Sequence, residues 1–402
     1  MAKKKEKNEL RKTNWISNFE LVGKAVVNDY TFSLDQHSEK SDWVWSRMNL
    51  LVDCGDKYGR VGCSLMGGYG INRDNFIYVH GKDESGKDDY SNFYTIDYDD
   101  RFNESILRDV GNGCFRTVAL ETDTKENIVS KKFLSVKDMV DYINDVIEDG
   151  MVVYVRGQLN YRIYNDTVQV EKDVNYIGLS RAEEDAFRAD FRQSVLLDQD
   201  AVVDIDQDKK SVSINGYILE KFKEFNGWDL TEGGEVKGGK FVPLLKNFEY
   251  SYANIPEEKV KKVIQYLFKV KKGVNQITFV GHFVESSALV QATEDDIPDD
   301  VKELIDLGIM TMDEAIADCV DTSRSREYKM VLDRPFIRKI TDDEGNVSNV
   351  VQVFEHVYED EDLQLDCLTK KEEPEDFEDA MNFPDELFND DDDSDTSWLD
   401  KL

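Results

Sequence analysis

The 402-residue chain holds 50 basic and 84 acidic residues, and its formal net charge of −34 excludes a uniformly basic surface that coats polyanions. A hydrophobic content of 40% and 33% charged residues are typical of folded domains with a soluble surface. The sequence has no run of about 20 apolar residues that could span a bilayer. We therefore expect two or three folded domains in a cytoplasmic protein without membrane contact.

Residues 1–13 contain six lysines and arginines and predict a basic N-terminal arm. No apolar segment follows this arm, so we do not expect it to be a secretory signal. The next segment, residues 14–180, alternates apolar and polar side chains in three stretches and then changes to a helical period. The expected strands are Phe19–Val27 with a central Gly23, Trp43–Val52 and Arg60–Met66, followed by a sharp turn at Gly67, Gly68 and Gly70.

A helix is predicted over Ser135–Gly150, with a capping-box-like start at Ser135 and Asp138, and a strand over Met151–Leu159 follows it. Three strands, a helix and two strands are the order of an OB-fold, a five-stranded barrel that binds oligonucleotides and oligosaccharides. A glycine inside a long first strand favours the strong bend that such a barrel needs. We therefore predict a mainly β fold, with an OB-like domain at residues 14–180.

The same order recurs about 120 residues later. The repeated elements are a strand Ser211–Leu219 around Gly216, a helix whose first turn holds Pro256, and a strand Gln276–Val284. This pattern predicts a second OB-like domain at residues 201–358, with an inserted helical pair at Asp296–Cys319. Residues 181–200 carry apolar side chains among charges and are interpreted as a connecting helix or linker.

Strand parity predicts a binding face, because successive side chains of a strand point to opposite sides. In Trp43–Val52 one parity is apolar, and the other carries Trp43, Trp45 and Arg47. The strand that begins at Met151 likewise carries Tyr154 and Arg156 on its non-core parity. Aromatic rings stack on unpaired bases while arginines neutralise phosphates, a combination that suits single strands without sequence preference.

Further candidates lie in the same strand or near the ends of the predicted strands. They are Arg162 and Tyr164 in the strand, Tyr58 and Arg60 between strands two and three, and Tyr69, Arg73 and Tyr78 around the glycine-rich turn. The alternative is that some of these aromatic residues pack against the second domain. Lysines along Glu257–Lys272 are open to two interpretations as well, a solvated helix face or a track for phosphates.

The last 44 residues, 359–402, hold 19 acidic residues against three lysines, a net charge of −16. Such a segment cannot bury enough apolar surface to order itself, so we expect a disordered tail. The tail closes with Trp398, Leu399 and Leu402, which is typical of a docking peptide, although a merely solubilising tail is the alternative.

Catalytic and metal signatures are missing from the sequence, so we expect no enzyme activity, no metal and no cofactor. The chain has no Gly-Lys-Ser/Thr phosphate loop, no nucleophile elbow and no paired-histidine motif. Five widely spaced cysteines predict reduced thiols rather than a disulfide framework: Cys54, Cys63, Cys114, Cys319 and Cys367.

Three segments make the chain similar to the single-stranded DNA-binding proteins of bacteria and their phages, large phage-encoded members above all. They are Phe19–Val27, Ser41–Trp45 and Gly67–Gly70, together with the acidic tail that ends in apolar residues. The resemblance implies coating of exposed strands in replication, recombination and repair, with the tail recruiting partner proteins. The ending Trp398–Leu402 departs from the usual Pro-Phe ending and leaves the tail's partner open.

Two other classes of function remain open from the sequence. One is a protein-binding barrel, either a virion component or an acidic inhibitor that mimics DNA. The other is a nuclease whose acidic ligands are scattered along the chain.

Overall fold

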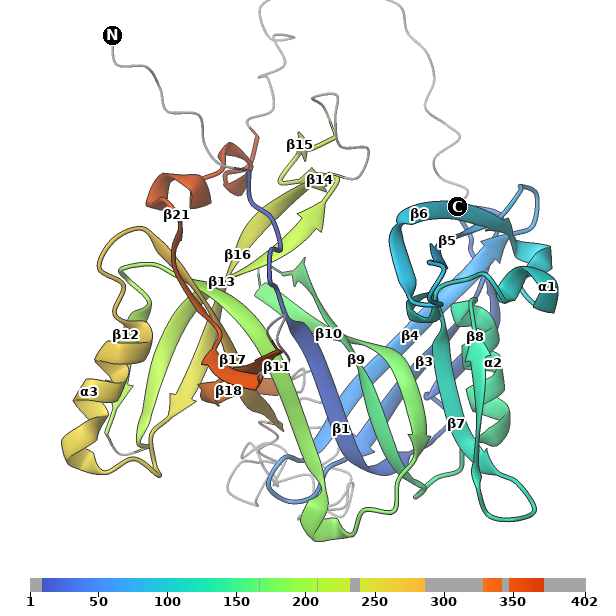
Figure 1. Ribbon diagram of the computed structural model, residues 1–402, viewed down its shortest axis with the longest axis horizontal. Helices are drawn as coiled ribbons and strands as arrows, with labels where there is room; N and C mark the ends of the chain where they lie inside the picture. Colours follow the sequence, from blue (N-terminus) through green and yellow to red (C-terminus); the bar gives the residue numbers. More distant parts are fainter. Residues whose placement is uncertain are drawn as a thin grey trace, which may run out of the picture.

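Two closed five-stranded β-barrels lie side by side in the computed structural model (Figure 1). The structure describes residues 9–165, 167–207, 209–231, 239–285, 328–341 and 347–371. The first barrel consists of β1 (Ser17–Val26), β3 (Trp43–Asp53), β4 (Arg60–Gly70), β9 (Val152–Tyr164) and β10 (Thr167–Leu179). It closes in the order β1, β3, β4, β10, β9 and back to β1, and only the contact of β4 with β10 is parallel.

The second barrel repeats this topology. Its strands are β11 (Arg188–Leu197), β13 (Ser211–Phe222), β16 (Lys240–Ser251), β17 (Val274–Glu285) and β18 (Tyr328–Pro335). It closes in the order β11, β13, β16, β18, β17 and back to β11, again with one parallel contact, between β16 and β18. The predicted mainly β, OB-like architecture with two barrels in tandem is therefore confirmed.

A helix of about three turns stands directly before the fourth strand of each barrel. Helix α2 (Val136–Val146) follows Ser135, whose hydroxyl accepts the backbone N–H of Asp138, as the capping pattern predicted. Helix α3 (Glu257–Phe268) follows Pro256. The two helices lie on the outer sides of the molecule, α2 against the first barrel and α3 against the second, where Phe268 packs on Tyr250 and Phe279 (Figure 1).

Additional strands and hairpins decorate both barrels. Those added to the main sheet are β2 (Phe32–His37), β7 (Arg116–Thr122), β8 (Ile128–Phe133), β12 (Val202–Asp206) and β21 (Val353–Tyr358). Separate hairpins are β5 (Phe76–Lys82) with β6 (Asp88–Asp97), β14 (Glu224–Phe225) with β15 (Trp228–Asp229), and β19 (Ile337–Thr341) with β20 (Val347–Val351). A one-turn helix, α1 (Glu104–Leu107), follows β6.

The first strands of the two barrels pair with each other, and this pairing makes the barrels one body. β1 and β11 run antiparallel, and Phe19 lies opposite Phe191. Each phenylalanine also faces a glycine on the fourth strand of its own barrel, Phe19 facing Gly157 and Phe191 facing Gly281. Both rings are almost fully buried, and a single hydrophobic cluster runs through both barrels.

The prediction of a connecting helix at residues 181–200 is wrong. After a short 3₁₀ turn at Glu184–Ala186 the chain enters β11, the first strand of the second barrel. The deciding pattern is the strict alternation of Ala189, Phe191 and Gln193 inward with Arg188, Asp190 and Arg192 outward. Helical spacing among the earlier alanines concealed this period.

The bounds predicted for the basic arm and the acidic tail need correction. The last residues of the arm and the first residues of the tail pack on the second barrel instead of lying outside the folded part. Leu10 and Leu363 are buried in one cluster against the second barrel, and Lys12 forms an ion pair of 2.9 Å with Glu220. Residues 360–368 form two 3₁₀ turns, and the indole N–H of Trp228 donates to the carbonyl of Thr369 at 3.0 Å. Apolar residues among the acids anchor residues 359–371. The remainder of the tail, with Trp398, Leu399 and Leu402, lies outside the described residues, as does the predicted helical pair at Asp296–Cys319.

The glycine-rich segment is not the predicted sharp turn, because β4 continues through Gly67 and Gly68 to Gly70. A side chain at Gly67 would come within 2.5 Å of Val136 in α2. The glycine therefore lets helix α2 pack closely on the barrel.

A buried cation on β10 predicts a specific dependence of stability on pH. Lys172 is 4% exposed, and its ammonium lies 4.4 Å from the centre of the Phe283 ring of the second barrel. Burial lowers the pKa of Lys172 to about 8, from 10.5. Between these values the unfolded chain binds the proton that the folded chain releases, so the free energy of unfolding rises with pH, by about 3 kcal/mol for this group.

Urea unfolding from pH 8 to 10.5 checks this prediction by comparing the wild type with Lys172→Met. In the variant, the free energy of unfolding should rise less with pH, because the contribution of Lys172 is absent. An equal rise in both proteins would assign the pH dependence to other groups.

Candidate nucleic-acid interface

Alternate side chains of strand β3 point to opposite sides, as predicted. One side faces the core, and the other is aromatic and basic. Val44, Met48 and Leu50 are buried inside the barrel. Trp43 and Trp45 are half-buried on the opposite side, followed by the exposed Arg47. The neighbouring positions on β4 are mostly small, since Trp43 pairs with Gly70 and Trp45 with Gly68.

The two indoles on this face are stacked. Their ring centres are 6.4 Å apart, and their planes differ by 29°. A side chain at Gly68 would come within 2.8 Å of the indole nitrogen of Trp43, and one at Gly70 would come within 2.1 Å of Nε of Arg73. The glycines of β4 therefore leave space in which the Trp43 ring and the Arg73 side chain lie over the strand.

Arg47 and Arg73 differ in how their charges are compensated. Nε of Arg47 donates to the neutral amide oxygen of Asn49 at 3.0 Å. Nε of Arg73 lies 3.7 Å from a carboxylate oxygen of Asp42. The outer face of β3 and β4 thus combines stacked aromatic rings with a guanidinium that is held in place by a neutral partner. We call Trp43, Trp45, Arg47 and Arg73 the tryptophan face.

The aromatic and basic residues of β9 form a second, separate patch. Val153 and Val155 point into the core, while Tyr154 and Arg156 point outward. The ring of Tyr154 lies 5.8 Å from that of Tyr176 on β10, and the guanidinium of Arg156 lies 5.1 Å from the Tyr176 ring. Burial raises the pKa of Tyr154. β3 and β9 are not neighbours in the barrel, so this tyrosine patch does not extend the tryptophan face.

Three other predicted residues lie in packing or ion-pair positions. Tyr58 contacts His282 of the second barrel edge-on, with ring centres 5.5 Å apart, which agrees with the alternative that some aromatic residues pack between the domains. Arg60 lies 3.5 Å from a carboxylate oxygen of Asp53 on the next strand. Tyr69 points to the opposite side of β4 from Gly68, and its ring lies 5.3 Å from that of Tyr98.

The last three predicted residues are exposed on other elements. Arg162 pairs with Glu171 at 2.8 Å near the tip of the β9–β10 hairpin, where Tyr164 is 57% exposed. Tyr78 is 83% exposed on β5. The structure therefore groups Trp43, Trp45, Arg47 and Arg73, and it distributes the other predicted residues over several surfaces.

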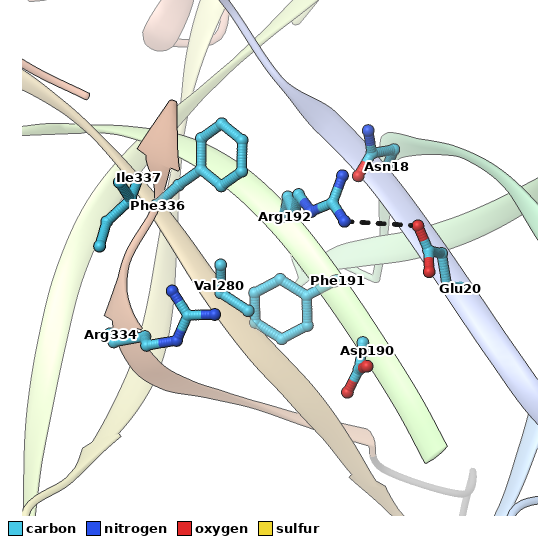
Figure 2. A pocket seen from close by; sticks show the side chains of 9 residues that line it. All are labelled: Asn18, Glu20, Asp190, Phe191, Arg192, Val280, Arg334, Phe336 and Ile337. Atoms are coloured by element: carbon cyan, nitrogen blue, oxygen red, sulfur yellow. Dashed lines mark ion pairs between the residues drawn. The ribbon is translucent and has the colours of Figure 1, made fainter. Parts of the chain in front are cut away.

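A polar pocket at the junction of the barrels was missed by the sequence analysis. Figure 2 shows Arg192 between Glu20 of β1 and the ring of Phe336, with Arg334 on the other side of the pocket. The cavity is about 210 Å³; Nη2 of Arg192 lies 3.5 Å from Glu20, and its guanidinium lies 5.5 Å from the Phe336 ring. Burial raises the pKa of Asp190, which also lines the pocket. The strict alternation along β11 is the signal that could have revealed Arg192.

The corresponding face of the second barrel has a different chemistry. On β13 and β16 the outward pairs include Ser213 with Glu249 and Asn215 with Asn247. The amide of Asn247 donates to Ser213 at 2.7 Å and to Asn215 at 3.2 Å. The side chains of this face therefore satisfy one another, and this part of the second barrel offers no equivalent of the stacked tryptophans.

Within the described ranges, no group of three or more histidine, cysteine or acidic side chains is arranged to hold a metal ion. In the same residues, no helix is long and apolar enough to cross a membrane.

Comparison with known proteins gives only a distant structural likeness. No family model and no curated protein matches the chain. Among solved structures it is similar to the single-stranded DNA-binding protein from Thermus aquaticus, with 10% sequence identity and a TM-score of 0.29 over 68% of this chain and 86% of that one. A deletion mutant of the same Thermus aquaticus protein gives the same identity and TM-score over 88% of its chain. At these values the likeness carries no functional weight.

Proposed function

We propose that this chain binds single-stranded DNA without sequence preference and that the tryptophan face of the first barrel is its principal contact. The observation that supports this most is the stacked pair of Trp43 and Trp45, half-buried on the outer side of a barrel strand next to Arg47. Flat rings on an outer sheet face stack with unpaired bases, at roughly 1 to 3 kcal/mol per base. In a duplex the bases are stacked on one another, so their faces cannot stack on the two tryptophans.

The charge distribution supports a local rather than a general attraction for DNA. The chain is strongly acidic, but Arg47 has a neutral partner and so retains its charge for a phosphate. In contrast, Arg192 lies near Glu20, and Arg188 lies 3.3 Å from Asp190 at the barrel junction. We therefore assign phosphate binding first to the tryptophan face and treat the tyrosine patch as a second contact, which a long strand reaches by wrapping around the barrel.

Binding of labelled single-stranded and duplex DNA of roughly 30 nucleotides, followed by fluorescence anisotropy, tests the proposal. We expect at least about tenfold tighter binding of the single strand, and an affinity that falls as salt rises because phosphate contacts release counterions. Equal affinity for the duplex would contradict it. Absence of binding would favour the protein-binding alternative, and magnesium-dependent cleavage would indicate a nuclease.

The acidic C-terminal segment extends the proposal to partners and regulation. Residues 372–402 hold 14 acidic residues and one lysine. We propose that this polyanion competes with DNA for the basic side chains, and that DNA binding then exposes Trp398, Leu399 and Leu402 to replication and recombination proteins.

Removal of residues 372–402 should tighten single-strand binding several-fold at low salt and have little effect at high salt, because screening weakens the competitor. Anisotropy titrations at both salt concentrations measure this difference. The truncation leaves residues 359–371 in place, since they pack on the second barrel. Unchanged or weaker binding of the truncated chain at low salt would disprove the competition.

A further inference from the structure

A cysteine, a histidine and an aspartate lie close together at the β5–β6 hairpin. Nδ1 of His80 on β5 is 3.2 Å from Sγ of Cys114, and Nε2 of the same ring is 3.3 Å from a carboxylate oxygen of Asp88 on β6. The side chains of His80 and Asp88 are 11% and 18% exposed. The sulfur also lies 3.9 Å from Nε2. The group thus combines a nucleophile, a base and an orienting acid, the kinds of side chain that activate a thiol in nucleophilic catalysis.

Asp88 is held in position by the loop that carries the cysteine. Its two carboxylate oxygens accept the backbone N–H groups of Asn112 at 2.6 Å and Gly113 at 2.8 Å. The hydrogen bond from Gly113, together with that from Asn112 and the contact with His80, lowers the pKa of Asp88. The carboxylate therefore stays ionised and fixes the orientation of the imidazole.

Two glycines allow the loop to fold tightly around these side chains. A side chain at Gly111 would come within 2.4 Å of the His80 ring, and one at Gly113 would come within 2.9 Å of the Asp88 carboxylate. No larger residue fits at these positions without moving the imidazole or the carboxylate. The glycines of Gly111–Cys114 thus leave the space that the side chains of His80 and Asp88 occupy.

Cys114 differs from the other three cysteines of the described ranges. Cys54, Cys63 and Cys367 are buried, and burial raises the pKa of each of these thiols, that of Cys63 to about 12. Cys114 is partly exposed, and its sulfur also accepts the backbone N–H of His80 at 3.3 Å. Among these four, Cys114 alone combines access from solvent with a neighbouring base.

We propose that Cys114 is a nucleophilic thiol, activated by His80 and positioned through Asp88, and that it is a site of oxidation by peroxides. In this reaction the Sγ proton passes to Nδ1 of His80, and the sulfur attacks one peroxide oxygen. The O–O bond breaks, and the leaving hydroxide takes the proton from Nδ1 and departs as water. Cys114 is oxidised to a sulfenic acid while the peroxide is reduced, and His80 returns to its neutral form.

An exposed aromatic surface adjoins the cysteine and the histidine. The ring of Tyr90 lies 4.5 Å from that of His80, the ring of Phe93 lies 6.3 Å away, and both aromatic residues are at least 66% exposed.

Alkylation of the full chain with two reagents tests the activation, with each cysteine followed by peptide mass spectrometry. Neutral iodoacetamide and anionic iodoacetate differ in their attraction to a protonated imidazole. We expect Cys114 to react faster than Cys54, Cys63 and Cys367. We also expect its iodoacetate-to-iodoacetamide rate ratio in the native protein to exceed the ratio in concentrated urea by roughly fivefold, the effect of one nearby positive charge.

The variants His80→Gln and Asp88→Asn show which side chain is responsible. His80→Gln should abolish the excess in the rate ratio, and Asp88→Asn should reduce it, because the imidazole loses its orienting partner. A native ratio equal to the urea ratio in the wild type would overturn the proposal, even if both variants failed to fold. So would an excess that persists in folded His80→Gln.

Trapping with dimedone after exposure to hydrogen peroxide tests the oxidation. The sulfenic acid adduct should form on Cys114 in the wild type, and it should be strongly reduced in His80→Gln. Equal labelling in the two proteins would contradict the role of His80, and absence of any adduct on Cys114 would contradict oxidation at this site. Neither experiment uses DNA, so their outcomes are independent of the function proposed above.

Discussion

If the chain binds DNA as proposed, the double substitution Trp43→Ala and Trp45→Ala should weaken binding of single-stranded DNA by about a hundredfold, because two stacking partners of roughly 1 to 3 kcal/mol each are removed from the tryptophan face. Both indoles are half-buried on the outer side of β3, so their loss leaves the core residues Met48 and Leu50 in place. Anisotropy titration with a single strand of fixed length measures the effect.

Two control variants distinguish the loss of stacking from the effect of removing any exposed aromatic side chain. Tyr266→Ala removes a 77% exposed aromatic side chain from α3 and should leave the affinity unchanged. The pair Trp43→Phe and Trp45→Phe keeps flat rings at both positions and should retain much of the affinity. A titration of the double alanine variant that coincides with the wild type would remove the tryptophan face from the interface.

Alanine at Gly157 or at Gly281 should destabilise the fold by about 3 kcal/mol or more, at the upper end of what overpacking costs. A methyl group at Gly157 would come within 1.8 Å of the carbonyl oxygen of Asp173 and 2.9 Å of the Phe19 ring. At Gly281 it would come within 2.2 Å of the carbonyl oxygen of Val331 and 2.4 Å of the Phe191 ring. The clash involves backbone atoms, so no side-chain rotation relieves it.

Urea denaturation of both variants measures the loss, and Gly150→Ala is the control. Gly150 has a φ of +81° but nothing within 4 Å of the added carbon. Its substitution should therefore cost only the backbone strain of about 1 kcal/mol. If Gly157→Ala and Gly281→Ala cost no more than this control, the close packing of glycine against phenylalanine is not essential to the barrels.

The sequence predicted those parts of the fold that depend on local periodicity. Alternation along β3 and β9 separated core residues from Trp45 and Tyr154, and the cap at Ser135 located the start of α2 to within a residue, although the helix ends at Val146 and not at the predicted Gly150. The same reasoning failed at β11, where apolar residues of a preceding turn imitated a helical stripe and concealed Arg192. Local patterns thus predicted most strands and helices of the barrels, but they misassigned β11 at the junction between the two barrels.

Long-range pairing could not be predicted, because it depends on which strands meet. Gly157 is 138 residues from Phe19, yet the two face each other, and only the closed barrel shows why a glycine is required there. Likewise β3 and β9 carry similar side chains but are not neighbours, so residues expected on one face lie on two. His80 and Cys114, 34 residues apart, form no recognisable spacing motif.

The pairing of β1 with β11 also determines how the molecule bears mechanical load. Six residue pairs join these strands side by side, from Ser17 with Gln193 to Val22 with Arg188. A force that pulls the barrels apart along the strand direction acts on this ladder in shear, so its hydrogen bonds must fail together rather than one after another.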